Sequence, residues 1–172
     1  MRSNGLGGTP IRDNNLAVIY SNLMEKYHFG GASKTGMYFD EENRRHMLNI
    51  REIFAEAAGN LADAGKTTEA KALIEKVEKE IPATALPYAM VSRYNSHNQT
   101  SLIYLEACYK AGMKDLAGKV KMAIQKDLEQ QAAYYKSIST KKPNAYPQFQ
   151  NSEEPINERL LLVLKEIETK YK

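Results

Sequence analysis

The stretch that decides the fold is DEENRRHMLNIREIFAEAAGNLADAGKTTEAKALIEKVEKEIP, residues 40–82. Asp40 is suited to cap a helix, and Glu41 and Glu42 follow in its first turn, where the helix dipole favours carboxylates. Apolar residues then recur at steps of three and four, as one helix face requires: Met47, Ile50, Phe54, Ala57 and Leu61. The pattern predicts a helix over residues 41–64 that stops at Gly65, a residue typical of helix ends.

A second apolar stripe begins immediately after that glycine. Its members fall on one helical face: Ala70, Leu73, Val77 and Ile81. Pro82 cannot continue the helix, so the second helix is expected over residues 66–81. Two amphipathic helices joined by a short polar turn fold back on each other, which predicts an antiparallel hairpin.

The hairpin pattern occurs twice. Ala64-Gly65 recurs as Ala111-Gly112, and an alanine follows five residues after each glycine, at Ala70 and Ala117. A second hairpin is therefore expected over residues 98–111 and 113–137, with Asn98 or Thr100 as its N-cap. The intervening residues 83–97, which include His97, are expected to form an inserted loop.

Helices flank the two hairpins. A stripe of Leu16, Ile19 and Leu23 predicts one over residues 14–27, and Ser152 is expected to cap a last helix over residues 152–171. Pro143 and Pro147 indicate a loop before it. Residues 1–13 are rich in glycine and are expected to be a flexible linker, which leaves one domain over residues 14–172. The fold class is all-α, with about six helices.

The register of the first hairpin resembles the tetratricopeptide repeat when Arg51 is its first position. The matching residues are Phe54, Ala57, Ala58, Leu61, Gly65, Ala70, Ile74, Val77 and Pro82. The second unit matches less well, because Lys121 stands where the repeat has an apolar residue. The resemblance implies helix hairpins in a short right-handed superhelical stack. It also implies a concave groove lined by Glu52, Ala55, Gly59 and Ala62.

A wider resemblance covers roughly residues 12–170. The segments that carry it are Asn22-Leu23-Met24, residues 37–41 (MYFDE) and Tyr134-Tyr135. Together they resemble the C-terminal soluble region of bacterial multi-spanning membrane proteins similar to protein O-mannosyltransferases, long labelled a domain of unknown function. The resemblance implies a non-catalytic accessory domain at the periplasmic face of the inner membrane, contacting an acceptor protein or its own parent chain. The alternative is a stand-alone adaptor that binds a peptide or partner helix.

Composition and charge narrow the function classes. The chain carries 24 basic and 21 acidic side chains, a net charge of +3, which is too balanced for a nucleic-acid partner. No apolar run approaches the length of a membrane span. The single cysteine, Cys108, lies in an apolar run and is expected to be a buried structural thiol.

No catalytic, cofactor or metal site is predicted. His28, His46 and His97 are scattered, and none has a carboxylate one turn away in a metal-binding arrangement. Residues 30–35 (GGASKT) lack the glycine before lysine that a phosphate-binding loop needs, so they are expected to be a connection. The small residues of the candidate groove leave room for a partner helix. That helix is expected to be a neighbouring helix of the same chain, of which residues 14–27 are one candidate, or a foreign peptide.

Overall fold

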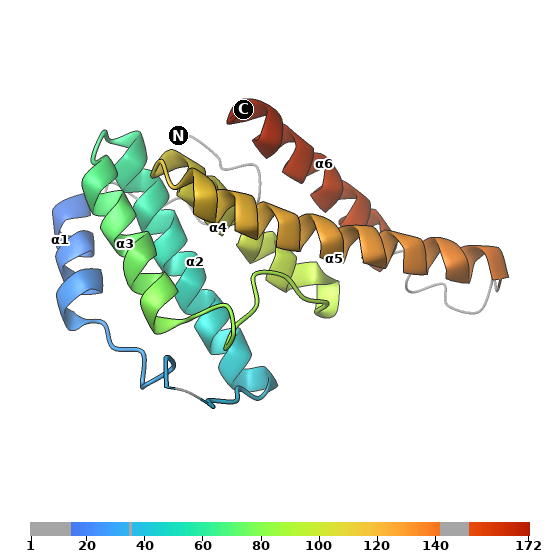
Figure 1. Ribbon diagram of the computed structural model, residues 1–172, viewed down its shortest axis with the longest axis horizontal. Coiled ribbons are helices and arrows are strands. Elements are labelled where there is room, and N and C mark those ends of the chain that lie inside the picture. The colour runs from blue at the N-terminus through green and yellow to red at the C-terminus, as the bar shows by residue number, and fades with distance from the viewer. Residues whose placement is uncertain (1–14, 35, 142–151) are drawn as a thin grey trace.

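The computed structural model describes residues 15–34, 36–141 and 152–172, and these residues are helical with no strand among them. The elements in chain order are α1 (Leu16–Ser21), the π-helical turn η1 (Asn22–Lys26), α2 (Glu41–Asp63), α3 (Thr67–Glu80), the 3-10 turn η2 (Arg93–Asn95), α4 (Ser96–Lys110), α5 (Lys114–Lys141) and α6 (Glu154–Lys170). Figure 1 shows these helices packed side by side. The all-α class and the six α-helices agree with the prediction.

Both predicted turns form at their glycines. Gly65 and Gly112 have φ of +78° and +74°, the left-handed region that glycine enters without a Cβ clash. The residue after each glycine donates its backbone N–H to the carbonyl five residues back, Lys66 to Leu61 at 2.8 Å and Met113 to Cys108 at 2.9 Å. These bonds are those of a Schellman helix end. The repeated Ala-Gly therefore encodes the same turn twice.

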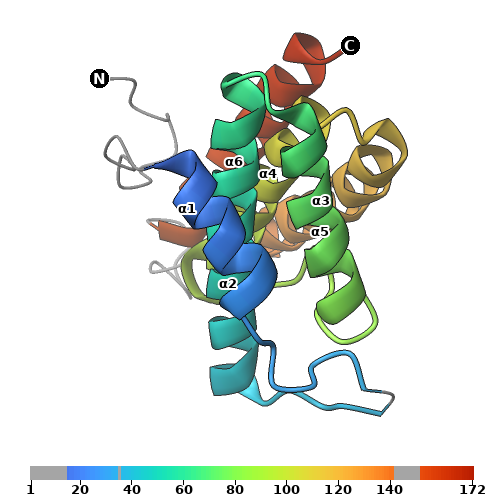
Figure 2. The same ribbon diagram turned by 90° about the vertical axis from the view of Figure 1, so that its left-hand side faces the viewer.

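The helices pack in a chain of neighbours around α2 and α4. α2 contacts α3 on one side and α4 on another, α4 contacts α5, and α5 contacts α6. The short α1 lies against α2, as the turned view in Figure 2 shows. Because α2 and α4 are the first helices of the two hairpins, their contact joins the hairpins into one body.

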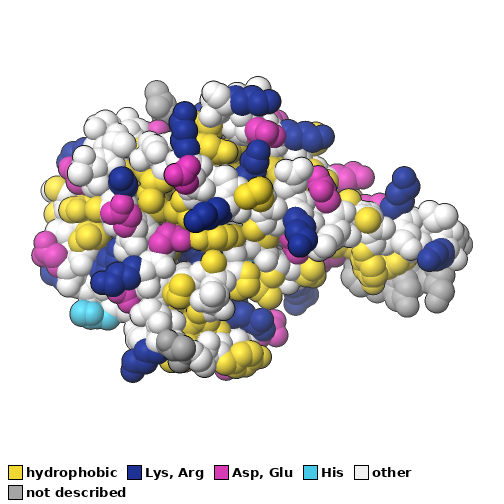
Figure 3. Space-filling view, in the orientation of Figure 1, with side chains coloured by type: hydrophobic (Ala, Val, Ile, Leu, Met, Phe, Trp, Pro, Cys, Tyr) yellow, Lys and Arg dark blue, Asp and Glu magenta, His cyan; other side chains and the backbone are white. Residues whose placement is uncertain are grey.

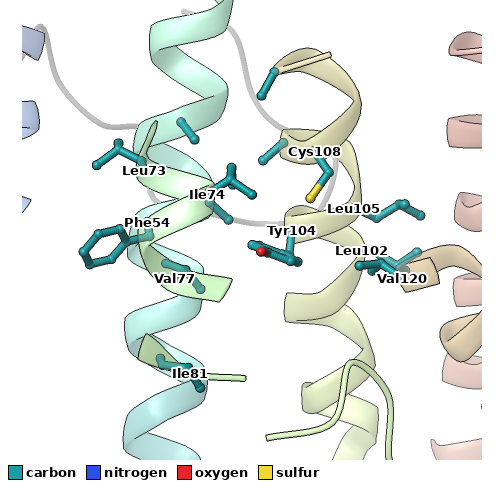
Figure 4. Close-up of a cluster of buried hydrophobic side chains, with 14 of the residues drawn as sticks. Phe54, Leu73, Ile74, Val77, Ile81, Leu102, Tyr104, Leu105, Cys108 and Val120 are labelled. Carbon is teal, nitrogen blue, oxygen red and sulfur yellow. The ribbon is translucent and has the colours of Figure 1, made fainter. Parts of the chain in front are cut away.

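The apolar stripes meet in one continuous core, part of which Figure 4 shows between the two hairpins. Phe54 and Ile74, which a wrong face assignment would have turned outward, are both fully buried. Ala70 is also fully buried, as its small size at a predicted helix crossing requires. Cys108 is a buried free thiol, and burial raises its pKa, which confirms the structural role expected for it.

Several helix boundaries differ from the prediction. α4 begins at Ser96 with Asn95 as its N-cap, so the proposed caps Asn98 and Thr100 were wrong: both are buried inside the helix. His97 belongs to the first turn of α4 rather than to a loop. α5 runs to Lys141, four residues beyond the predicted end. The N-cap position of α6 holds Glu153, one residue after the predicted Ser152, with Pro155 in the first turn as expected.

The N-terminal helix is shorter and less regular than residues 14–27 suggested. It consists of α1, capped by the Asn15 side chain, followed without a break by η1. The predicted linker at residues 1–13 and the prolines Pro143 and Pro147 lie outside the described residues. Within the described ranges, no helix is both long and apolar enough to cross a bilayer.

Candidate functional site

The candidate groove on α2 faces another helix of the same chain. Ala55 is fully buried and Gly59 is buried, with the Lys110 side chain of α4 at 4.0 Å from the position a Gly59 Cβ would take. Glu52 accepts a hydrogen bond from Thr100 of α4 at 3.2 Å, and Ala62 is half-buried. At Glu52 and Gly59 the neighbouring helix of the same chain is α4. Small residues on this face permit the close approach of α2 and α4.

The margin of that face stays accessible. Ile53 is 47% exposed, one of the large apolar side chains that the fold leaves accessible. Glu56, one turn further, is half-buried, and burial together with the nearby Glu52 carboxylate raises its pKa. Glu52, Ile53 and Glu56 thus combine an apolar contact with two neighbouring carboxylates on the open side of α2. We call these three residues the α2 margin.

Arg51 is the most unusual side chain in the core, because it is charged and fully buried. Its guanidinium donates to three backbone carbonyls of the segment that follows α3: Ile81 at 3.3 Å, Leu86 at 2.8 Å and Pro87 at 3.1 Å. It also lies over the rings of Tyr88 and Tyr104, 5.6 and 5.7 Å from their centroids. Five N–H donors in a rigid fork suit this arrangement, which fixes the chain between α3 and α4.

A carboxylate completes the surroundings of Arg51. Glu78 of α3 accepts hydrogen bonds from the Tyr88 and Tyr104 hydroxyls at 2.5 and 2.7 Å. Burial and the Glu78 carboxylate raise the pKa of both tyrosines, so both hydroxyls keep their protons and donate. His97 contributes from α4, its Nε2 lying 2.8 Å from the Pro87 carbonyl. Apart from the Arg51 Nε, which is buried without a hydrogen-bond partner among the described residues, the polar groups named here bond to the connection between α3 and α4 or to the tyrosines packed beside it.

A second buried polar cluster joins α4, α5 and α6. Asn95 donates from its amide to Gln131 of α5 at 2.9 Å and to Asn157 of α6 at 3.4 Å. Asn98 and Gln131 each donate to the Asp127 carboxylate at 2.7 Å. Asn157 in turn donates to the Leu128 carbonyl at 3.1 Å. This amide cluster, defined as Asn95, Asn98, Asp127, Gln131 and Asn157, fixes how the last helix sits on the second hairpin.

The backbone leading into α4 is strained. Tyr94 and Asn95 both have positive φ, 53° and 54°, a region that residues other than glycine occupy at a cost of roughly 1–2 kcal/mol each. The Tyr94 amide donates to the Glu153 carboxylate at 3.0 Å, and the Asn95 side chain is held inside the amide cluster. Contacts from α5 and from the start of α6 therefore hold the Tyr94–Asn95 backbone, which we call the elbow. Tyr94 itself is 48% exposed.

The N-terminal helix is attached through one ammonium group. Lys76 of α3 donates to the carbonyls of Leu23, Met24 and Tyr27 at 2.6, 2.8 and 3.2 Å. These carbonyls lie at the end of η1, where the negative end of the helix dipole attracts a cation. A shallow cavity of about 220 Å³ lies beside it, lined by Met24, Glu25, Tyr27, His28, Phe29, Lys76 and Glu80. Because all three lysine donors are already used, the ammonium offers nothing further to a ligand.

The remaining sequence candidates do not converge. Asp40 caps α2 through the Asn43 amide at 2.8 Å, as predicted. His46 is exposed, and its Nε2 lies 3.1 Å from the Glu42 carboxylate one turn earlier. A single carboxylate is too few ligands for a metal, and no described residues form a group of three or more His, Cys, Asp or Glu side chains that could hold one.

Arg51, Lys76 and the amide cluster were missed because single polar residues on helices look solvated in a sequence. Arg51 lies three residues from both Leu48 and Phe54, on the buried side of α2, and that spacing could have indicated that it is buried.

Comparison of the chain with protein-family models, with curated proteins and with solved structures found no match.

Proposed function

We propose that this chain is a non-catalytic helical-repeat accessory domain, the C-terminal soluble part of a membrane glycosyltransferase-like protein, which contacts a partner or acceptor protein. The observation that carries this proposal is the contact between α2 and α4, the first helices of two hairpins with the same glycine turn. Side-by-side first helices are the arrangement by which tetratricopeptide-like hairpins build a stack with an exposed binding face. The parent and its glycosyltransferase character rest on the sequence resemblance.

The polar clusters favour a binding role over a catalytic one. Arg51, Glu78 and His97 bond to the connection between α3 and α4 or to tyrosines packed beside it. The amide cluster holds α6. Groups committed in this way are not free to exchange protons with a substrate, because each would have to break an internal bond first.

The α2 margin is the part of the predicted groove that a partner can reach. Ile53 supplies apolar area, and Glu52 and Glu56 supply a negative charge that suits a basic or amide-rich segment. A foreign peptide does not need to separate α2 from α4 to touch these side chains. We therefore expect partner contact along this margin, and the test is replacement of Ile53 by a photo-crosslinking residue in cells, with the same replacement at Lys79 on α3 as control.

The two readings of the chain differ in the size and location of the natural product. An antibody against this domain should detect, in the membrane fraction of the source cells, a polypeptide much larger than the 19.4 kDa of this chain. Detection of a 19.4 kDa product in the aqueous fraction would support the stand-alone adaptor instead. If the parent is found, removal of residues 14–172 should reduce acceptor modification while leaving the remaining membrane part correctly inserted. Unchanged acceptor modification would overturn the accessory role.

A further inference from the structure

The longest helix has a lysine-rich outer face. α5 is 28 residues long, about 42 Å at ~1.5 Å per residue, and its core side packs against α4 and α6. Its outer side carries five exposed lysines: Lys114, Lys119, Lys126, Lys136 and Lys141. In Figure 1 the C-terminal part of α5 extends past the other helices, and in Figure 3 lysine and arginine side chains are interspersed with acidic and apolar ones on this face of the molecule. This set of five is called the α5 lysine face.

These lysines are not neutralised within the part of the chain that the structure describes. The sixth lysine of α5, Lys121, pairs with Glu168 at 3.1 Å, whereas none of the five has an ion pair to a described side chain. The exposed acids of α5 offset two of these five positive charges and leave an excess of three. Asp127 is engaged by Asn98 and Gln131, which leaves Asp115 and Glu129 as the exposed carboxylates of the helix.

We propose that the α5 lysine face adsorbs to an anionic phospholipid surface, with the helix lying parallel to the plane of the headgroups. Lysine ammoniums are mobile point charges without the bidentate geometry of arginine, so a line of them suits a diffuse anionic plane better than one fixed acidic pocket. Met122 lies between Lys119 and Lys126 and is 63% exposed, an apolar side chain at the level where interfacial helices contact the acyl boundary. The contact is peripheral and needs no membrane-spanning segment.

This inference does not depend on the parent proposed above, because it concerns the isolated domain and its own charges. Each lysine close to an anionic membrane strengthens binding by about 1 kcal/mol, which is roughly a fivefold change in partition coefficient. Five lysines and one apolar side chain are enough for measurable adsorption, and the attraction should fall steeply with salt because it is screened within a Debye length.

Flotation with vesicles of phosphatidylcholine alone, or of phosphatidylcholine mixed with phosphatidylglycerol, tests the proposal. The full chain should float with the mixed vesicles, stay behind with the neutral ones, and be released by high salt. The double variant Lys119→Gln/Lys126→Gln should bind about 30-fold more weakly. The matched control, Lys79→Gln/Lys165→Gln, removes two exposed lysines from α3 and α6 and should bind like the parent chain.

Circular dichroism of all variants checks that the fold is retained. Absence of binding to mixed vesicles, equal binding to neutral vesicles, or equal weakening by the control pair would each overturn the proposal. Soluble polyglutamate that binds the chain as tightly as the vesicles, with the same dependence on Lys119 and Lys126, would also overturn it. That result would assign the face to an acidic polypeptide.

Discussion

Replacement of Arg51 by alanine should be among the most damaging single changes in the α2–α4 body. The change removes a buried guanidinium that donates to the carbonyls of Ile81, Leu86 and Pro87. Hydrogen bonds to a charged group contribute about 1.5–3 kcal/mol each. The three are not additive, because Pro87 keeps its contact with His97 and the 3.3 Å bond to Ile81 is the longest. Loss of a buried charged partner costs about 3–5 kcal/mol in total, and we expect Arg51→Ala to fall in that range.

The assay is urea denaturation followed by helical circular dichroism, with hydrogen exchange of residues 82–95 as a local readout. Arg51→Lys keeps the charge but not the fork and should lose about 1–3 kcal/mol. The control is Arg45→Ala on the same helix. Its 2.6 Å pair with Glu42 is solvent-exposed, so its loss should change stability by less than about 1 kcal/mol. An Arg51→Ala midpoint close to that of Arg45→Ala, or unchanged protection of residues 82–95, would refute the role assigned to Arg51.

Three further predictions concern stability. Burial lowers the pKa of His97 from 6.5 to about 4, so the unfolded chain binds more protons than the folded chain between these pH values. The free energy of unfolding should therefore be highest above pH 6.5 and decrease by about 3 kcal/mol as the pH falls to 4. In a pH series of denaturation midpoints, His97→Gln should flatten this decrease. Phe54 is fully buried against Tyr27 and Phe29, so Phe54→Ala should lower the free energy of unfolding by about 3–5 kcal/mol. Ala70 is also fully buried, and Ala70→Leu should lower it by about 1–3 kcal/mol through overpacking. Denaturation midpoints equal to that of the parent chain would show that these residues are wrongly assigned to the core. Lys76→Met should abolish hydrogen-exchange protection of residues 16–26 while leaving that of α4 and α5 intact, and simultaneous loss in all of them would mean that the N-terminal helix is not attached as described.

The hairpins could be predicted because their determinants are local. The stripes around Phe54 and Ile74 and the turns at Gly65 and Gly112 depend only on residues within a few helical turns of each other. The segment between α3 and α4 could not be predicted in the same way. Its path is set by hydrogen bonds from Arg51, which is 36 residues before Pro87 in the chain, and the periodicity of the sequence does not predict such bonds.

The error at the start of α4 has the same origin. Asn98 and Thr100 resemble caps in the sequence, but the helix begins earlier, with Asn95 at the N-cap position in a left-handed conformation and the Ser92 hydroxyl accepting from the His97 amide. Hydrogen bonds to α5 and α6 hold the Asn95 side chain. The helix that packs on the candidate groove depends on contacts between residues far apart in the chain, such as Glu52 and Thr100. The small residues Ala55 and Gly59 were correctly read as a close-approach surface, but the sequence alone did not say that the approaching helix would be α4.

The amide cluster also has a consequence for the order of folding. Asn95 and Asn157 are separated by 62 residues, so their contact closes a much longer loop than either hairpin turn does. Each hairpin can form from neighbouring residues, whereas the contact between Asn95 and Asn157 needs α4, α5 and α6 in place together, so we expect it to form late. When Asn157 reaches Asn95, the two amides exchange hydrogen bonds with water for a hydrogen bond with each other, beside the left-handed backbone of Tyr94 and Asn95. Substitution of Asn157 should accordingly speed unfolding far more than it slows folding.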